Sequence, residues 1–350
     1  MVKYNYRKYL LLLLTILIFI MVLELSYKIK YSSIEEISDI DLLSSSERYG
    51  NASDNLILSY EPIANYSRDI YDINSQGLRD YDYSVQKPND TFRAIVFGDS
   101  VTFGYGVLLE DIYSTKLEQY LRENYSDDVY DSFEVINFGV DGYNTLQESE
   151  LLKHKAINYD PDLIIIGFVL NDWDTPWIIP FIPEKLIERE DLIDSFLPKK
   201  CARRTNLRRT LEKSWFVKES SLMNIIFDAT IFSYKKHSYN NAFKDPCRFG
   251  KIEYALEQFR LIGEEYDVPI LLVLFPVKYF DLPYPYLPLH EQMVNIGSEK
   301  GFYVLDLQES FFEKNHELFL PHDSGHPDEE GHALAAKEMY DLILSENIIS

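Results

Sequence analysis

From about residue 91 onward, short apolar runs alternate with longer amphipathic stretches. The runs are rich in Val, Ile, Leu and Phe and show no polar alternation, which is typical of strands buried on both faces. They occupy residues 93–97, 134–138, 162–169, 269–275 and 302–307. Helical patterns follow at residues 110–124, 145–158, 252–266, 290–300 and 331–344. This alternation predicts an α/β domain over residues 91–350, with a mainly parallel sheet of about five strands between two layers of helices.

The first predicted strand stops at Gly98-Asp99-Ser100. The glycine predicts a tight strand-to-helix turn that exposes the Ser100 hydroxyl at the carboxyl end of the sheet, where such sheets bind ligands. Far downstream, Asp323 and His326 lie three residues apart. A serine nucleophile needs a base to take its proton, and the base needs a carboxylate to fix its tautomer. Ser100, His326 and Asp323 are therefore the predicted catalytic residues.

Acyl transfer also needs hydrogen-bond donors for the oxyanion of the tetrahedral intermediate. The second predicted strand is followed by Gly139 and Gly142, and the third by Asn171-Asp172. The predicted donors are the N–H of Ser100, the N–H of Gly142 and the Asn171 amide, with Gly139 as an alternative to Gly142.

Each of these residues also has a simpler interpretation. Ser100 and Asn171 could cap helices, and Asp323 could lie in a polar turn with His326 exposed. Their joint occurrence favours a catalytic site. Asp99 and Asp172 flank this set, and we expect them to hold its loops. His332 is expected to be structural.

Four ordered blocks of the sequence resemble the SGNH or GDSL hydrolase family: residues 98–101, 137–142, 167–172 and 323–327. The resemblance covers the chain from about Phe92 onward, and Val101 replaces the leucine usual in the first block. It implies a flavodoxin-like three-layer α/β/α fold and serine esterase activity without a metal or organic cofactor. The family spacing from Asn137 favours Gly142 as the oxyanion glycine.

The resemblance implies an esterase or O-deacetylase that acts on acylated carbohydrate or cell-envelope substrates. Alternatives are an O-acyltransferase or a lipid esterase with the same triad, or a catalytically silent binding protein. The presence of every triad and oxyanion residue type argues against the silent protein. The formal net charge of −23 argues against a nucleic-acid partner. The sequence does not indicate an oligomeric state.

The first 30 residues predict a membrane anchor. Lys3, Arg7 and Lys8 precede an apolar run over residues 9–23. A helix over residues 9–27 would be about 28 Å long, close to the roughly 30 Å hydrocarbon core. The basic residues favour a catalytic domain outside the cytoplasm. A cleaved signal peptide is the alternative, although no small-residue cleavage site follows the run.

Residues 31–90 form the predicted link between anchor and domain. Residues 31–55 are rich in Ser, Glu and Asp, which suggests a solvated stalk, and residues 57–85 suggest short strands. Residues 74–80 predict a β-turn with Gly77 at positive φ and Arg79 paired to a surface carboxylate. A substrate contact is the alternative for this turn.

Residues 173–250 interrupt the alternation as a long insertion. It begins with an apolar segment, 177–183, and continues with a basic tract between residues 199 and 209. The insertion could cover the substrate site, form a solvated surface addition, or contact anionic lipid or polymer. The chain's two cysteines, Cys201 and Cys247, could form a disulfide in an oxidising compartment or remain thiols.

Overall fold

The computed structural model describes one compact unit of the chain. The described residues are 50–125, 129–172, 192, 243–278, 284–314, 318–321, 323 and 325–349, and all of them belong to this unit. The predicted anchor and most of the predicted insertion lie outside the described residues.

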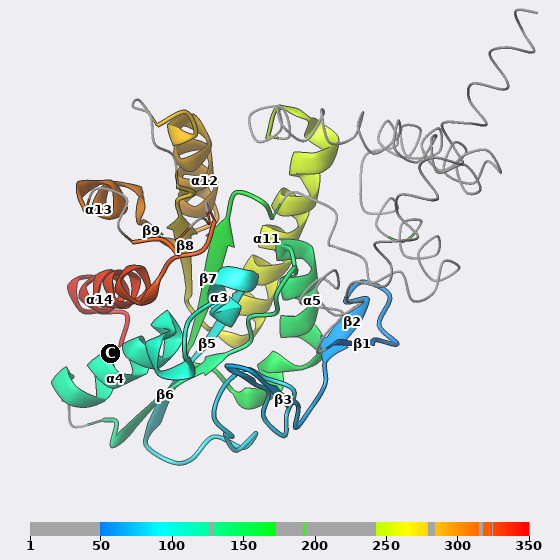
Figure 1. The fold of residues 1–350 in the computed structure, drawn as a ribbon, viewed down its shortest axis with the longest axis vertical. Coiled ribbons are helices and arrows are strands. Elements are labelled where there is room, and N and C mark those ends of the chain that lie inside the picture. Colours follow the sequence, from blue (N-terminus) through cyan, green and yellow to red (C-terminus); the bar gives the residue numbers. More distant parts are fainter. Residues whose placement is uncertain are drawn as a thin grey trace, which may run out of the picture. The chain divides into compact units, whose positions relative to one another are not determined.

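The centre of the unit is a five-stranded sheet in which all strands are parallel (Figure 1). Its order is β6-β5-β7-β8-β9. The strands are β5 (Thr91–Gly98), β6 (Ser132–Asn137), β7 (Leu163–Val169), β8 (Ile270–Phe275) and β9 (Tyr303–Asp306). Strand β6 lies on one side of β5, and β7, β8 and β9 follow on the other side. The direction in which strands are added to the sheet therefore reverses at β5. The predicted α/β fold and strand number are confirmed.

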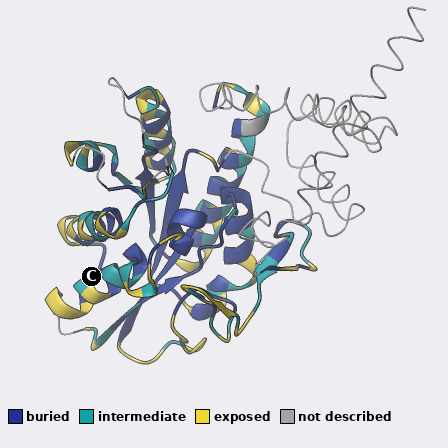
Figure 2. Cartoon of the chain, in the orientation of Figure 1, coloured by how far each residue is buried: buried dark blue, intermediate teal, exposed yellow. Residues whose placement is uncertain are grey.

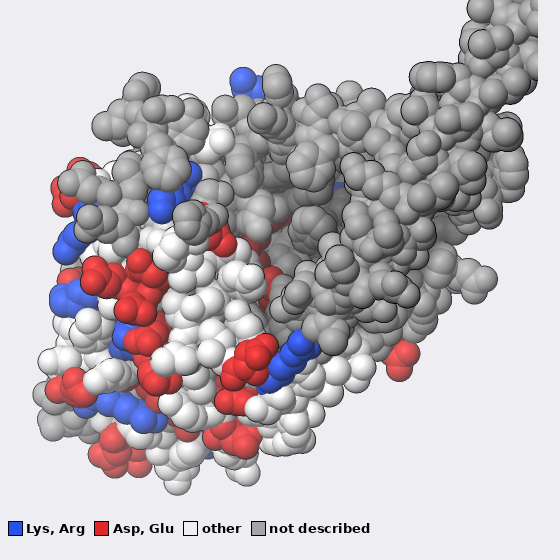
Figure 3. All heavy atoms as spheres, in the orientation of Figure 1, with Lys and Arg blue, Asp and Glu red and all other residues white. Residues whose placement is uncertain are grey.

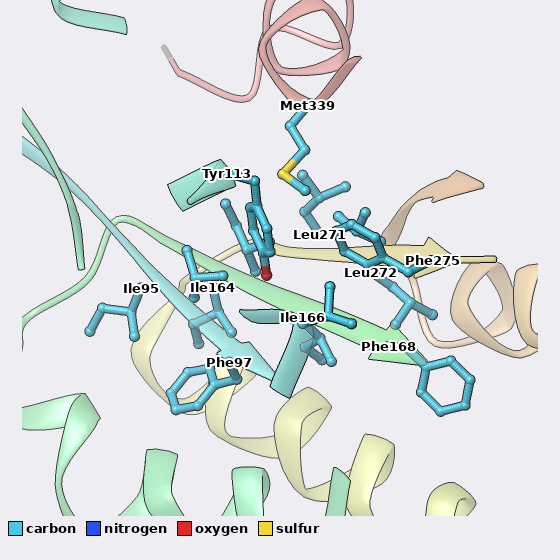
Figure 4. Packing of buried hydrophobic residues seen from close by; sticks show 14 of the residues in the cluster. Ile95, Phe97, Tyr113, Ile164, Ile166, Phe168, Leu271, Leu272, Phe275 and Met339 are labelled. Carbon is cyan, nitrogen blue, oxygen red and sulfur yellow. The ribbon is translucent and has the colours of Figure 1, made fainter. Parts of the chain in front are cut away.

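Helices cover both faces of this sheet (Figure 1). Helices α4 (Tyr113–Asn124) and α14 (Glu329–Ser345) pack together on one face, where Figure 4 shows Met339 above Leu271 and Tyr113 to one side of it. Helices α5 (Thr145–His154) and α11 (Pro246–Tyr266) pack together on the opposite face. Helix α12 (Leu287–Glu299) lies against β8 and β9.

The strands are apolar throughout because both faces are covered. All residues of β5, β7 and β8 are buried, and the sheet is the most buried part of Figure 2. Phe97 packs against Phe259 of α11, while Tyr113 of α4 packs against Phe275 from the other face. Removing such rings from water supplies the main stabilisation of a core like this one.

Several element boundaries differ from the sequence-based expectation. Helix α11 begins at Pro246 rather than residue 252, because Asp245 caps it by accepting a hydrogen bond from the Cys247 N–H at 3.0 Å. Cys247 is disulfide-bonded, and Cys201 lies outside the described residues. Short helices α13 (Gln308–Glu313), η1 (Leu109–Asp111) and η2 (Ala156–Tyr159) were not predicted as separate elements.

The N-terminal segment forms two small antiparallel pairs. Strand β1 (Gly50–Ala52) pairs with β2 (Tyr60–Pro62), and β3 (Ser67–Arg68) with β4 (Tyr71–Asp72). The prediction of short strands in residues 57–85 is confirmed. The predicted stalk extended too far, because residues 50–52 form β1 and Ser53 is buried against Glu61.

No helix among the described residues is both long enough and apolar enough to span a bilayer. Acidic and basic side chains are interspersed on the described part of the face in Figure 3.

Candidate active site

Ser100 is the first residue of a one-turn helix, α3 (Ser100–Phe103), directly after β5. Asp99 caps this helix, because its Oδ1 accepts a hydrogen bond from the Val101 N–H at 2.9 Å. The Tyr105 N–H donates to the Ser100 carbonyl oxygen at 2.9 Å and closes the turn after the helix. The turn leaves the Ser100 residue 9% exposed at the carboxyl end of the sheet.

The fold brings Ser100 next to His326, although 226 positions separate them in the chain. His326 Nε2 lies 2.8 Å from Ser100 Oγ, and His326 Nδ1 lies 2.7 Å from Asp323 Oδ2. The other oxygen of Asp323 accepts the backbone N–H groups of Gly325 and His326 at 2.7 and 3.1 Å. The three predicted catalytic side chains therefore form one hydrogen-bonded chain.

The state of Asp323 determines the tautomer of His326. Partial burial raises the pKa of Asp323, but hydrogen bonds from Gly325 and His326 outweigh it, and the pKa lies below its usual value. Asp323 is therefore a carboxylate at neutral pH, and the His326 Nδ1–H donates to it. This leaves the lone pair of Nε2 to accept the Ser100 hydroxyl proton.

Asn171 is exposed at the end of β7 and is tied to the turn that carries Ser100. Its side-chain Nδ2 donates to Asp99 Oδ2 at 2.9 Å. A primary amide has two N–H bonds, so one remains to meet a ligand. Asp99 thus binds the Asn171 side chain with one oxygen and caps α3 with the other.

The structure distinguishes between Gly139 and Gly142, the two candidates for the oxyanion glycine. The Gly139 N–H already donates to Asn137 Oδ1 at 2.8 Å, and a Cβ at Gly139 would lie 2.6 Å from the Phe103 nitrogen. Gly139 therefore allows the close approach of α3. Gly142 has φ of +79° in a turn that the Tyr143 N–H closes onto the Val140 carbonyl at 3.0 Å. Gly142 remains the candidate donor.

Residues 96–334, which are more than half of the chain, match the GDSL-like Lipase/Acylhydrolase family. The chain belongs to this family. It is therefore a serine esterase with the SGNH-type α/β/α fold. No curated protein matches the chain.

Three solved structures of similar proteins cover most of the chain at low identity. The acetylxylan esterase Axe2 from Geobacillus stearothermophilus is 17% identical, with 72% of this chain and 94% of that chain covered and a TM-score of 0.44. TesA is 10% identical, with coverages of 73% and 99% and a TM-score of 0.43. A putative lipolytic protein of the G-D-S-L family from Desulfitobacterium hafniense DCB-2 is 13% identical, with coverages of 71% and 98% and a TM-score of 0.40.

Two buried carboxyl groups, those of Asp172 and Glu148, lie near Asp99 in the turn that carries Ser100. Asp172 Oδ2 accepts the Val169 N–H at 3.1 Å, which closes the loop that carries Asn171. Glu148 of α5 is fully buried, and neither of its carboxyl oxygens has a hydrogen-bond partner among the described residues. Burial and the neighbouring Asp99 raise the pKa of Glu148 well above its usual value. Burial, Glu148 and Asp99 likewise raise the pKa of Asp172.

Glu148 was missed by the sequence analysis. Its position inside an amphipathic helix is ordinary for a solvated glutamate, and only the packing of α5 behind the site reveals its burial.

The predicted surface ion pair of Arg79 is wrong. Gly77 does adopt a positive φ of +75°, but Arg79 is only 1% exposed. Its guanidinium donates to the carbonyl oxygens of Ile70, Phe103, Gly104 and Val107. The next residue, Asp80, is also buried and accepts the Asn137 N–H at 2.7 Å. The turn over residues 74–80 therefore supports the loops of the site from inside the protein.

His332 is structural in the sense expected. It is fully buried, its Nδ1 accepts the Tyr113 N–H at 3.2 Å, and its ring stacks on Tyr113. Burial and nearby positive charges lower the pKa of His332 to about 3, so its ring is neutral.

Proposed function

We propose that this esterase uses Ser100 as nucleophile, His326 as general base and acid, and Asp323 as the carboxylate that orients His326. The observation that supports this assignment is the continuous hydrogen-bonded chain from Asp323 through His326 to Ser100 Oγ. A protein that only kept the fold for binding would not need these three groups aligned.

The reaction proceeds in two proton-balanced steps. Ser100 Oγ attacks the ester carbonyl carbon while its proton passes to His326 Nε2, and Asp323 stabilises the resulting imidazolium. The imidazolium then returns the proton to the leaving alcohol as the C–O bond breaks, which leaves an acyl-Ser100. Water then attacks this acyl group while one of its protons passes to His326 Nε2. The imidazolium returns that proton to Ser100 Oγ as the acyl C–Oγ bond breaks, and the carboxylic acid departs.

The oxyanion is bound by the Ser100 N–H, the Gly142 N–H and the Asn171 amide in this proposal. Each such donor lowers the barrier by roughly 3–4 kcal/mol in serine hydrolases. Asp99 and Asp172 act through the loops that carry these donors.

We infer that the substrates are acylated carbohydrates or other acylated molecules of the cell envelope. The N-terminal 30 residues, proposed as an uncleaved anchor, would hold the catalytic domain at the outer face of the membrane, where such substrates occur. The similar protein Axe2 is named as an acetylxylan esterase, and acetylxylan is an acylated carbohydrate of this kind.

A lipid ester is the second candidate substrate. The apolar segment 177–183 follows Asn171 closely in the sequence, and the proposed anchor would hold the domain at a bilayer. Transfer of the acyl group to a sugar hydroxyl instead of water would use the same residues.

The substrate proposal is tested with the 350-residue chain in a mild detergent. Acetylated xylooligosaccharides, and p-nitrophenyl esters of two to sixteen carbons, are offered in turn, and acid release is compared with acyl transfer to added sugar. We expect acetate release from the acetylated sugar and a rate that falls with acyl length. A rate that rises with acyl length would favour the lipid esterase, and acyl-sugar product would favour the transferase. Ser100→Ala is the inactive control in each assay.

A further inference from the structure

An aromatic ring that the mechanism above does not use lies directly on the catalytic base. The centroid of the Tyr105 ring is 4.6 Å from that of His326, with 38° between the planes. Tyr105 in turn stacks on Tyr71 at 6.3 Å, and Tyr71 stacks on Phe103 at 5.6 Å. Tyr105 is 36% exposed, so the ring that contacts His326 also reaches the surface.

Arg79 fixes the backbone on both sides of Tyr105. Its guanidinium donates to the carbonyl oxygens of Phe103 at 2.8 Å and of Val107 at 2.6 Å, and also to that of Gly104. Its Cζ lies 4.6 Å from the centroid of the Tyr71 ring. The Tyr71 hydroxyl accepts the Gly106 N–H at 3.1 Å, which adds a further tie to the same loop.

Tyr71 and Arg79 precede the part of the chain that matches the family, residues 96–334. The N-terminal segment therefore supplies a support for the base that lies outside the matched domain. This support depends on buried hydrogen bonds from one guanidinium to several carbonyls, which a lysine could not reproduce.

We propose that Tyr105 is a positioning residue for His326, held in place by Tyr71 and Arg79, and that its ring face stabilises the imidazolium formed when Ser100 gives up its proton. The electron-rich face of an aromatic ring attracts a cation, and the attraction increases as water is excluded. Tyr105 neither gains nor loses a proton in the reaction. This inference rests on the proposed function, because it concerns the base of that mechanism.

In the part of the chain that the structure describes, three other titratable groups interact with His326. Asp323 is on its own loop, Asp99 is on the turn before α3, and His332 is on α14. A substitution at Tyr105 keeps all three of these side chains in the protein. A change in the pH dependence of a Tyr105 variant therefore reports the ring itself.

The experiment compares Tyr105→Leu and Tyr105→Phe with the matched control Tyr266→Leu. Tyr266 is 53% exposed at the end of α11, so its substitution removes a surface ring away from the site. For each variant, kcat/KM for p-nitrophenyl acetate is measured from pH 5 to 9, and thermal unfolding is followed by circular dichroism.

We expect Tyr105→Leu to lower kcat/KM about tenfold and to move the acidic limb of the profile to lower pH by roughly half a unit, because the imidazolium loses the ring. Tyr105→Phe keeps the ring face, so its kcat/KM should stay within about twofold of the parent's. The acidic limb of its profile should lie at the same pH as in the parent. Tyr71→Leu should lower activity in the same direction, and adding it to Tyr105→Leu should cost little more, because the two act as one unit.

The inference is overturned if Tyr105→Leu has the same pH profile as the parent. It is also overturned if Tyr105→Leu and Tyr105→Phe lose equal activity and the acidic limb of Tyr105→Leu stays where it is in the parent. Either result leaves the proposed function intact, provided that the parent is active and Ser100→Ala is not. A parent chain that is folded but has no esterase activity would instead refute the proposed function.

Discussion

At the scale of single residues, Asp99 joins two parts of the site. One oxygen caps the helix that begins with Ser100, and the other accepts the Asn171 amide. Both bonds require an acceptor, and a carboxylate provides one on each oxygen. Because Asp99 is only 1% exposed, water cannot replace either bond easily.

Asp99→Asn should therefore lower kcat with little change in KM. The asparagine can still cap α3 through its oxygen, but its NH2 group faces the Asn171 NH2 and repels it. We expect a loss of about 10- to 100-fold, smaller than the 10²- to 10³-fold expected for Asn171→Ala. Steady-state kinetics on p-nitrophenyl acetate measure both. If Asp99→Asn raises KM and leaves kcat unchanged, Asp99 does not act through Asn171.

Glu148 predicts a pH dependence of stability. Its pKa is raised by burial in the folded state, so the unfolded chain releases this proton at a lower pH than the folded protein. In the pH range between the two pKa values the folded state binds more protons, and stability falls as pH rises from about the usual value of 4.5. Glu148→Gln removes this loss.

We expect Glu148→Gln to melt a few degrees above the parent at pH 8 and to differ least from it near pH 5. Melting curves from pH 5 to 8 give the comparison, with Glu253→Gln on the exposed side of α11 as the control. A Glu148→Gln protein that is less stable than the parent at pH 8 would mean that the Glu148 carboxylate is ionised and satisfied in the fold.

At the scale of elements, strand β2 contacts the turn that carries Gly142, the proposed oxyanion donor, as β4 contacts the loop that carries Tyr105. The Tyr60 hydroxyl donates to the Asp141 carbonyl oxygen, next to Gly142, and the Tyr143 hydroxyl donates to the Tyr60 carbonyl oxygen. The rings of Tyr60 and Tyr143 also pack edge to face at 5.1 Å. The small N-terminal strands therefore contact the loops after both β5 and β6.

Tyr60→Phe should lower kcat about tenfold and reduce stability by about 1–3 kcal/mol, because the buried Asp141 carbonyl loses its donor and the Gly142 turn loses its tie. Tyr83→Phe is the matched control, because it also deletes a tyrosine hydroxyl. The Tyr83 hydroxyl donates to Glu118 Oε2 at 2.8 Å and does not contact the Gly142 turn. Kinetics and urea unfolding are measured on both. Equal kcat losses in the two variants would show that the Tyr60 hydroxyl does not affect catalysis through the turn that carries Gly142.

At the scale of the whole molecule, the sheet and the serine turn were predictable for the same reason. Strands that are buried on both faces cannot alternate polar and apolar residues, so β5, β7 and β8 stand out as continuous apolar runs. Their carboxyl ends meet at one edge of a parallel sheet, which places Ser100 and Asn171 together without knowledge of any contact. The Asp323–His326 spacing then indicated the remaining partners.

The supports of the site could not be predicted in this way. Arg79 lies in a turn whose sequence suits a surface, and its burial depends on four carbonyls, three of which lie far along the chain. Tyr105 stands in a glycine-rich loop, and its contact with His326 joins positions that are distant in sequence. Glu148 has the sequence context of any exposed helical glutamate. Long-range packing determines all three, and local patterns carry no information about it.

The predicted anchor leads to a prediction about the intact chain. Expressed in bacterial cells, the protein should sediment with membranes, resist extraction by alkaline carbonate and keep its N-terminal residues in an intact-mass measurement. The reason is that an apolar helix of this length is retained by the bilayer unless it is cleaved. A soluble chain that lacks the first 25 to 30 residues would show that the segment is a cleaved signal peptide.

The most direct measurement is intact-mass analysis of the 350-residue chain after reaction with a fluorophosphonate, which phosphonylates an activated serine. The parent should gain one adduct, and the adduct should map to Ser100. Ser100→Ala should gain none, and His326→Ala should react far more slowly because its serine has lost its base. A folded parent that gains no adduct, or an adduct that persists in Ser100→Ala, would contradict the assignment of Ser100 as the nucleophile.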